Sequence, residues 1–291
     1  MFPIISELHG DGIPVAVSCR VLKLARQPYY RWLQQPMGPV EARRKILTEA
    51  VGQAHVDDPE FGYRFLADEV RLAGHKVCDR TVWRICSTNR WWASFTKKKN
   101  RKTSRPAAVD HDDLVRRDFT AKEPNTVWLS DITEHRTGEG KLYLCAIKDL
   151  WSNRIVGYSI SDRMKARLAV AAVETAVARR NENVAGCILH TDRGSQFRAR
   201  KFKRCLDRHG LVGSMGQVGS AGDNAAMESF FSLLQKNVLN TRKWATRQQL
   251  RIAIVTWIER TYHHRRRQTR LNKLTPIEYE TIMKPAALKA A

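Results

Sequence analysis

The feature of this sequence that most constrains its fold is the order of its short apolar segments between residues 126 and 215. Three runs rich in Val, Ile, Leu and Tyr follow one another, at 126–132, 141–148 and 154–160. Runs of this length, separated by Gly, Ser and Asn, are typical of consecutive antiparallel strands. Helical and strand-like segments then alternate, at 166–180, 187–191, 200–209 and 211–215. Antiparallel strands followed by this alternation predict an α/β domain with a mixed sheet and covering helices.

Three more helices are expected after the last strand, at 224–239, 248–262 and 276–283. Apolar residues recur along them at helical spacing. We therefore expect the α/β domain to span residues 120–285, with basic helices forming its C-terminal part.

The first 36 residues are helical in pattern and lack strand-like runs. Apolar residues recur at helical spacing over 15–24, and a second short helix over 29–34 begins beside Pro28. Two short helices joined by a tight turn have the form of a helix-turn-helix, which predicts one such unit at 1–36. The alternative is a plain helical hairpin that does not touch DNA.

A second helical unit with a basic linker is expected at 37–108. It contains predicted helices at 62–72 and 79–87, and Asp79 is the expected N-cap of the second of them. The linker carries a basic run that includes Lys97, Lys98 and Lys99. Such a run is consistent with a solvated linker and also with one that follows DNA phosphates.

The charge of the chain favours a polyanionic partner. It has 51 Lys and Arg against 29 Asp and Glu, a formal net charge of +22. So large a charge opposes compaction unless it meets a polyanion, and nucleic acid is the first candidate. An anionic membrane is the second, but no apolar run approaches the roughly 20 residues that span a bilayer, so no membrane partner is expected.

Three acids stand out by their placement. Asp131 interrupts the first apolar strand, Asp192 stands where the fourth strand ends, and Glu228 lies in the helix at 224–239. Functional groups of open α/β sheets gather at strand ends, and three carboxylates there repel one another unless cations neutralise them. Oxygen ligands of this kind suit Mg²⁺ or Mn²⁺, and two such ions can clamp a phosphodiester during in-line displacement. Taken singly, each acid could instead be an ion-pair partner, a loop cap or an exposed helical charge.

The three acids occur within three motifs in a fixed order. Asp131 lies in WLSDIT, Asp192 in HTDRGSQF and Glu228 in DNAAMESFF, and 35 residues separate Asp192 from Glu228. In these motifs the sequence resembles the DDE transposases of the insertion-sequence-three family, which are related to retroviral integrases. The resemblance is strong over residues 125–280 and weaker over residues 1–108.

The resemblance implies a ribonuclease H-like core and a divalent-metal-dependent reaction at one site. A metal-bound water would cut the end of the element to leave a 3′-hydroxyl, and that hydroxyl would attack another phosphodiester. Asp131, Asp192 and Glu228 would hold two Mg²⁺ or Mn²⁺ ions. The implied partners are DNA, both element ends and target, and further copies of the chain on that DNA. The resemblance also implies a bacterial cytoplasmic protein at the nucleoid, and an upstream-frame helix-turn-helix protein, separate or fused by frameshifting.

The DNA contacts expected from the sequence lie in the motifs, the C-terminal basic cluster and the linker. They are Arg193, Ser195, Gln196, Asn224, Gln235, Lys236, Arg265, Arg266, Arg267, Lys97, Lys98 and Lys99. A Lys is usual in the family where this chain has Gln235, and Lys236 follows it. At about 100° per residue of a regular helix, Gln235 rather than Lys236 should share the face of Glu228. His263 also departs from the usual Asn.

Two other function classes remain open at this stage. A DNA-binding regulator, or a degenerate element copy, would carry the same charge without catalysing transfer. A ribonuclease H-like nuclease would cut DNA without joining it. Joining of a labelled 3′-hydroxyl end to target DNA would distinguish these classes from a transposase, whereas salt-sensitive DNA binding would not.

Overall fold

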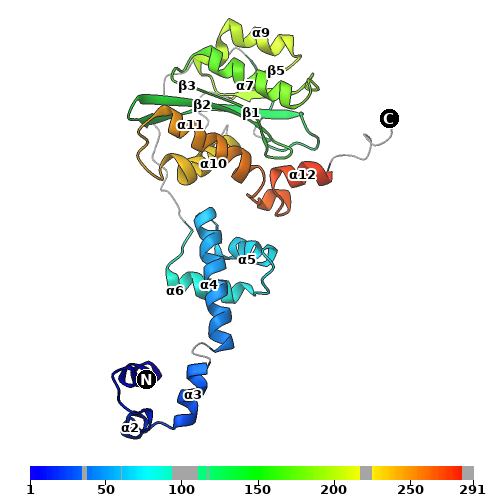
Figure 1. Ribbon diagram of the computed structural model, residues 1–291. Helices are drawn as coiled ribbons and strands as arrows, with labels where there is room; N and C mark the ends of the chain where they lie inside the picture. The colour runs from blue at the N-terminus through cyan, green and yellow to red at the C-terminus, as the bar shows by residue number, and fades with distance from the viewer. Residues whose placement is uncertain (35–37, 60, 94–110, 117, 217–224, 284–291) are drawn as a thin grey trace. The chain divides into compact units, whose positions relative to one another are not determined.

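The computed structural model describes residues 1–34, 38–59, 61–93, 111–116, 118–216 and 225–283. The chain divides into two compact units, Met1–Ser94 and Phe95–Ala291, and each is described here by itself (Figure 1). Within the described ranges, no helix is both long enough and apolar enough to cross a membrane.

The first unit begins with three short helices. They are α1 (Phe2–Gly10), α2 (Val15–Val21) and α3 (Arg26–Gln34). Their apolar faces meet in a small core made of Ile5, Val15, Cys19 and Tyr29. The helix expected at 29–34 begins earlier, at Arg26, because Pro28 fits the first turn of a helix and does not delay its start.

Three more helices follow in the first unit. They are α4 (Pro39–Asp57), α5 (Tyr63–Leu72) and α6 (Asp79–Asn89). Leu47 and Val51 of α4 pack with Leu66 of α5 and Val82 of α6 in a separate core.

The N-cap predicted for α6 is wrong by one residue. Cys78 occupies the N-cap position, and Asp79 is the first residue of the helix. The Asp79 carboxylate makes an ion pair with Arg71 of α5. Its charge also lies at the positive end of the helix dipole, so Asp79 stabilises α6 from inside the first turn.

The second unit is built on the five-stranded mixed sheet that the sequence predicts. Its strands are β1 (Val127–Thr137), β2 (Gly140–Asp149), β3 (Ile155–Ser161), β4 (Ile188–Thr191) and β5 (Val212–Met215). They lie in the order β3-β2-β1-β4-β5. The first three are antiparallel neighbours, whereas β4 pairs parallel with β1 and β5 pairs parallel with β4. This is the ribonuclease H-like α/β arrangement that the resemblance implies.

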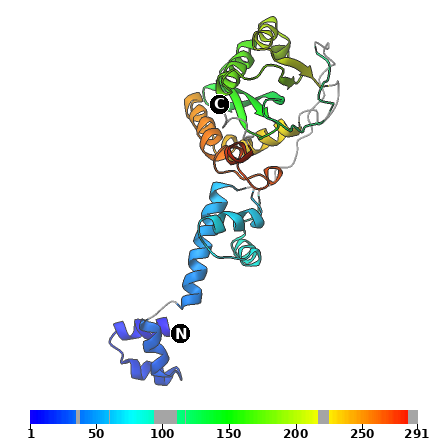
Figure 2. The same ribbon diagram turned by 90° about the vertical axis from the view of Figure 1, so that its right-hand side faces the viewer.

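Helices cover both faces of this sheet (Figures 1 and 2). One face carries α7 (Ala166–Arg179) and α9 (Arg200–Arg208), and the other carries α10 (Ala225–Leu234) and α11 (Arg247–Thr256). Each face has its own apolar core. Gly157 of β3 lets α7 approach closely, because a Cβ there would lie 2.3 Å from the carbonyl oxygen of Ala172.

The C-terminal helices differ from their prediction as continuous regular helices. The segment 235–239 forms the π-helix η1 (Gln235–Leu239), and α11 passes into the π-helix η2 (Trp257–Tyr262). A π-helix bonds residue i to i+5, a change that apolar spacing alone does not reveal. The short helix predicted at 276–283 is confirmed as α12 (Pro276–Met283), after the turn η3 (Thr269–Leu271).

A buried group of charged side chains fastens α12 to the sheet. Glu280 of α12 is 5% exposed and accepts hydrogen bonds from Arg154 at 2.6 Å and from Arg180 at 2.5 Å. Arg180 also donates to the fully buried Asp149 at the end of β2, at 2.9 Å. Breaking a buried pair of this kind leaves an uncompensated charge, so the network fixes where the C-terminal helix docks.

His263 makes a second buried link between the C-terminal segment and the sheet. The backbone N–H of Ile155 donates to His263 Nε2 at 3.2 Å, so that nitrogen must be unprotonated. Nδ1 therefore carries the proton and donates to Glu259 Oε2 at 3.1 Å. Burial lowers the pKa of His263 although Glu259 opposes that shift, and the imidazole is neutral in the folded protein.

We predict that His263→Asn flattens the acid side of the stability profile. A His whose folded pKa lies below its ordinary value of 6.5 costs stability as the pH falls below that value, because the unfolded chain binds the proton more readily. The wild type should lose on the order of 1 kcal/mol between about pH 7 and about pH 5 through this group. Denaturant unfolding at several pH values measures the loss. The matched control is His264→Asn at the exposed neighbouring position, and an equal effect of both substitutions would contradict the assignment.

Candidate active site

The pairing of β1 with β4 places two of the three predicted acids at the same level of the sheet. The strands are parallel, and Leu129 lies opposite His190. Asp131 follows Leu129 by two residues, and Asp192 follows His190 by two. Both strands advance by the same distance per residue. Asp131 and Asp192 are therefore equally far along their strands, each two residues beyond the pair Leu129 and His190.

The third acid belongs to the helix that covers this part of the sheet. Leu129 packs in the core on the α10 side, together with Met227 of α10. Side chains alternate across a strand, so Asp131 lies on the same face of β1 as Leu129. Glu228 follows Met227 in the first turn of α10 and is exposed.

The pKa of a neighbouring thiol is affected by the charges of both aspartates. Burial raises the pKa of the Cys145 thiol on β2 to about 12, against a hydrogen bond with Ser130. The negative charges of Asp131 and of Asp192 both raise the pKa further. Coulomb effects fall off with distance, so both carboxylates lie near this one side chain.

Backbone hydrogen bonds orient both aspartate side chains. The N–H of Ile132 donates to Asp131 Oδ1 at 2.7 Å, and the N–H of Gly194 donates to Asp192 Oδ1 at 2.9 Å. A Cβ at Gly194 would lie 2.9 Å from Asp192 Oδ1 and 2.4 Å from Gln196 Nε2. The glycine therefore makes room for the carboxylate and the amide to lie close to the chain.

The loop after β4 is fastened to the neighbouring strand. Arg193 Nε donates to the carbonyl of Gly216, just beyond β5, at 2.8 Å. The short helix α8 (Ser195–Arg198) begins at Ser195, which is exposed, while Gln196 is half-buried. Arg193 thus has a structural contact within the loop, and Ser195 is the most accessible of the three candidate DNA contacts here.

The three acids do not form a complete metal site in this structure. Among the described residues, no three His, Cys, Asp or Glu side chains are grouped so that they could hold a metal ion. Asp131 and Asp192 are brought level, while Glu228 stands one turn into α10. The candidate DNA contact Asn224 lies outside the described residues, as do Lys97, Lys98 and Lys99 of the linker.

Comparison with known proteins identifies the kind of enzyme. Residues 121–221 and residues 209–276 each match an integrase core domain family. Transposase InsF of insertion sequence IS3A, from Escherichia coli K12, is 34% identical over 289 residues, which cover 94% of this chain and 96% of that protein. The putative transposase InsK of insertion sequence element IS150, from the same strain, is 30% identical over 279 residues, covering 95% and 96%. A chain of the simian T-cell lymphotropic virus intasome aligns with a TM-score of 0.45 at 17% identity, over 72% of this chain and 69% of that one.

This chain belongs to the IS3 family of transposases. It is therefore an enzyme of the polynucleotidyl transferase type, and its substrate is DNA. The reading of the chain as a DNA-binding regulator is not favoured.

The π-helix η1 of this transposase begins at Gln235, and Asn240 N donates to Gln235 O at 2.8 Å, which is an i to i+5 bond. Because α10 is a regular α-helix from Glu228 to Leu234, the rule of about 100° per residue applies as far as Gln235. It no longer applies from Lys236 onwards, within the π-helix. Gln235 is exposed and Lys236 is half-buried.

The three arginines of the predicted C-terminal cluster, Arg265, Arg266 and Arg267, differ in their exposure. Arg266 is 8% exposed. Arg267 donates to the carbonyl of Lys273 at 3.0 Å and lies 3.3 Å from the Glu278 carboxylate. These two arginines have structural contacts inside the C-terminal segment. Arg265 is the exposed one of the three, so it can bind a phosphate without losing a buried contact.

A buried lysine that the sequence analysis did not single out supports the helix of Glu228. Lys148 of β2 is 5% exposed, and its Nζ donates to the carbonyl oxygen of Ala226 in the first turn of α10 at 3.3 Å. Burial lowers the pKa of Lys148 to about 7, and the positive charge of Arg270 contributes to the shift. In the sequence, Lys148 is the last residue of the apolar run at 141–148, and that run does not show that its amine is buried.

We predict that Lys148→Met stabilises the transposase at neutral and acid pH. An unfolded lysine keeps its proton up to about 10.5, whereas the folded site releases it near 7, so stability rises as the pH increases between these values. Removing the amine should remove that rise and add roughly 1–4 kcal/mol below pH 7. Thermal unfolding across this pH range measures the change. Lys141→Met, which removes an exposed lysine from the same strand, is the control, and a destabilised K148M protein would contradict the prediction.

Proposed function

We propose that this transposase catalyses divalent-metal-dependent DNA cleavage and strand transfer with Asp131, Asp192 and Glu228 as its catalytic acids. The observation that carries the proposal is the level placement of Asp131 and Asp192 at the ends of two parallel strands. Glu228 completes the set from α10, on the face of the sheet toward which Asp131 is directed.

The donor chemistry of these residues suits Mg²⁺ or Mn²⁺, although the three acids, which lie within the described ranges, are not grouped around one point in this structure. The charges of Asp131 and Asp192 both raise the pKa of Cys145. Neighbouring carboxylates repel each other, and a bound cation would reduce that repulsion. The donors are carboxylate oxygens on a half-buried and an exposed aspartate, which suits hard ions that keep several waters. When bound, such ions lower the pKa of water and neutralise the charge of attacking and leaving oxygens.

The chain's own residues hold and orient this site. The backbone N–H of Ile132 binds one carboxylate oxygen of Asp131, and the backbone N–H of Gly194 binds one carboxylate oxygen of Asp192, so each aspartate side chain is oriented by the chain itself. Lys148 holds the first turn of α10, from which Glu228 extends. Two reactions then share the site: water attacks a phosphodiester at the element end and displaces its 3′-oxygen, which leaves as a 3′-hydroxyl. That hydroxyl then attacks a target phosphodiester and displaces the 3′-oxygen of the target strand. Neither step requires a covalent bond between protein and DNA.

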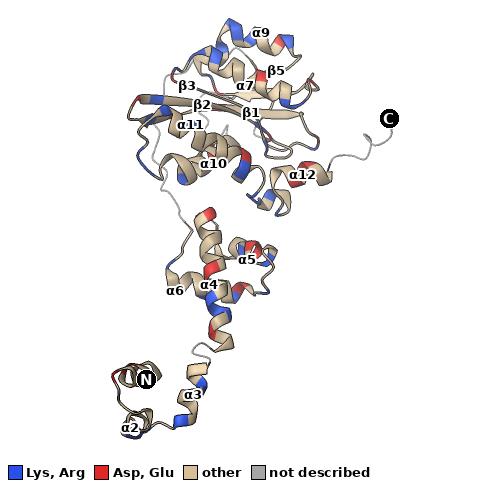
Figure 3. Ribbon diagram, viewed as in Figure 1, with Lys and Arg blue, Asp and Glu red and all other residues tan. Residues whose placement is uncertain are grey.

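DNA recognition is divided between the two units in this proposal. The helical units at 1–36 and 37–108 bind the element ends, and the core at 120–285 carries out the chemistry. Lys and Arg residues occur along both units (Figure 3). The active form is an assembly of several copies on DNA, in the bacterial cytoplasm at the nucleoid. The product of an upstream frame, separate or fused, contributes further end recognition.

We predict that Asp131→Asn, Asp192→Asn and Glu228→Gln each reduce strand transfer by more than about a hundredfold while DNA affinity changes little. Each substitution removes the charge that binds metal and keeps the size of the side chain. Loss of outer partners of metal ligands alone costs about 10–100-fold, so loss of a ligand should cost more. The measurement is joining of a labelled 3′-hydroxyl end to target DNA in Mg²⁺. Asp207→Asn on α9 is the matched control, and normal joining by any triad variant would remove that residue from the site.

We also predict that deleting residues 1–108 reduces end-specific DNA binding more than non-specific binding. The reason is that the helical units supply recognition, while the charge of the remaining chain still attracts any DNA. Binding to a duplex carrying the terminal repeat that flanks the gene is compared with binding to an unrelated duplex. Circular dichroism checks that the truncated protein is folded. Unchanged end preference in a folded truncated protein would mean that these units are only structural.

A further inference from the structure

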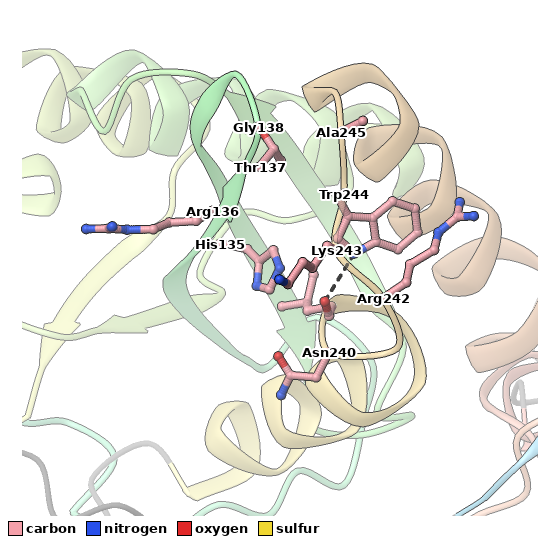
Figure 4. A pocket seen from close by; sticks show the side chains of 10 residues that line it. His135, Arg136, Thr137, Gly138, Asn240, Arg242, Lys243, Trp244 and Ala245 are labelled. Carbon is pink, nitrogen blue, oxygen red and sulfur yellow. Dashed lines mark hydrogen bonds between the residues drawn. The ribbon is translucent and has the colours of Figure 1, made fainter.

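A pocket of about 760 Å³ lies at the far end of the β1–β2 hairpin from the catalytic acids (Figure 4). One wall is the hairpin end at 135–138, and the other is the segment 239–245 that follows η1. His135 stands on the same face of β1 as Asp131, four residues further on, which at about 3.3 Å per residue is roughly 13 Å away. The pocket therefore lies outside the catalytic site but on the same side of the sheet.

Specific contacts hold the two walls together. Gly138 N donates to the carbonyl of Trp244 at 2.8 Å, and Trp244 Nε1 donates to the carbonyl of Leu239 at 3.1 Å. A Cβ at Gly138 would lie 2.6 Å from the carbonyl oxygen of Ala245, so only glycine allows this approach. The pocket is thus formed by the fold and does not depend on a ligand to shape it.

The pocket is strongly basic. Arg136, Arg242 and Lys243 line it, and no Asp or Glu does. Within the part of the chain that the structure describes, Arg136 and Lys243 have no carboxylate partner. Arg242 lies 4.2 Å from the centre of the Trp244 ring, a contact that holds the guanidinium without neutralising it.

The acids closest in sequence to the pocket are already occupied. Glu134 makes an ion pair with Lys141 at 2.9 Å. Glu139 accepts a hydrogen bond from the backbone N–H of Arg247 at 2.9 Å. Among the described residues, neither carboxylate forms an ion pair with Arg136, Arg242 or Lys243, so these cations can meet an external anion.

We propose that this pocket binds the sugar–phosphate backbone of DNA during transposition. The cations are arranged for an extended anion, because Arg136 and Arg242 reach toward opposite sides of the pocket with Lys243 between them (Figure 4). A single small anion would contact one of these groups, whereas consecutive phosphates can contact all three in turn. The proposal rests on the transposase function proposed above, since it requires DNA to continue past the catalytic acids along the β1–β2 hairpin.

The first test removes charge from the pocket. Each protein–phosphate contact contributes about 0.9 to the slope of log affinity against log salt, so its loss weakens binding roughly eightfold at about 0.1 M salt. The double variant R136Q/K243Q should lower that slope by one to two units and weaken duplex binding accordingly. The matched control is K201Q/R204Q on α9, which removes the same charge elsewhere. An unchanged slope in R136Q/K243Q, or an equal loss in the control, would overturn the proposal.

The second test fills the pocket without changing its charge. Asn240 lines the pocket and is exposed, so Asn240→Phe places an aromatic ring in the space a backbone would occupy. A binding pocket predicts weaker duplex binding in N240F, of the same order as in the charge variant. Attraction by diffuse surface charge predicts no change, and that result would also overturn the proposal. Unfolding measurements confirm that each variant is folded.

The same variants distinguish which DNA the pocket holds. Binding is measured with a duplex carrying the terminal repeat that flanks the gene and with a duplex of unrelated sequence. A weakening confined to the first duplex identifies element-end DNA, and an equal weakening of both identifies target DNA. Because these are binding measurements, they stand even if Asp131→Asn leaves strand transfer intact and the proposed catalytic function fails.

Discussion

The parallel pairing of β1 with β4 is the constraint on which the rest of the core depends. β1 is also the antiparallel partner of β2, so its register is fixed from both sides. A parallel partner requires a crossover, and α7 supplies it between β3 and β4. Gly157 allows α7 to pack directly on β3. Asp131 and Asp192 are far apart in sequence. They lie equally far along neighbouring strands only because the crossover brings β4 beside β1 in this register.

Buried polar contacts around the end of β2 add to the apolar packing of the core. Arg180 pairs with Asp149 and with Glu280, and Arg154 also pairs with Glu280. Lys148, the next residue along β2 toward the sheet interior, reaches the first turn of α10. Burying charged groups costs free energy, and it specifies position because only one arrangement satisfies them. The same stretch of β2 thus positions the C-terminal helix and the helix that carries Glu228.

The sheet could be predicted because strand and helix patterns differ in period. Asp131 stood out because it interrupts an apolar strand, where an unpaired carboxylate is costly, and Asp192 and Glu228 stood out by their motifs and spacing. The sequence did not predict the π-helices, since an i to i+5 bond at Gln235 leaves the apolar pattern almost unchanged. Nor did it predict the burial of Arg266 or the ion pair of Arg267, because an arginine's partner is set by tertiary structure. The contact of Lys148 with α10 is likewise set by tertiary structure. The hairpin pocket joins segments about a hundred residues apart, which no local pattern connects.

The ion pairs of the Lys and Arg side chains indicate which part of the positive charge is available to bind DNA. A charge of +22 predicts a polyanion but not where it binds. In the core, Arg154, Arg179 and Arg180 form ion pairs with buried or half-buried acids. These arginines stabilise the fold and are not available to bind DNA phosphates. Arg136 and Lys243 have no such partners among the described residues, although acids stand nearby in sequence. Glu134 is paired with Lys141, and Glu139 accepts from the backbone of Arg247, so neither contacts the lining cations of the pocket. Cations without a carboxylate partner, on a pocket that the fold itself forms, are the ones positioned to bind phosphate.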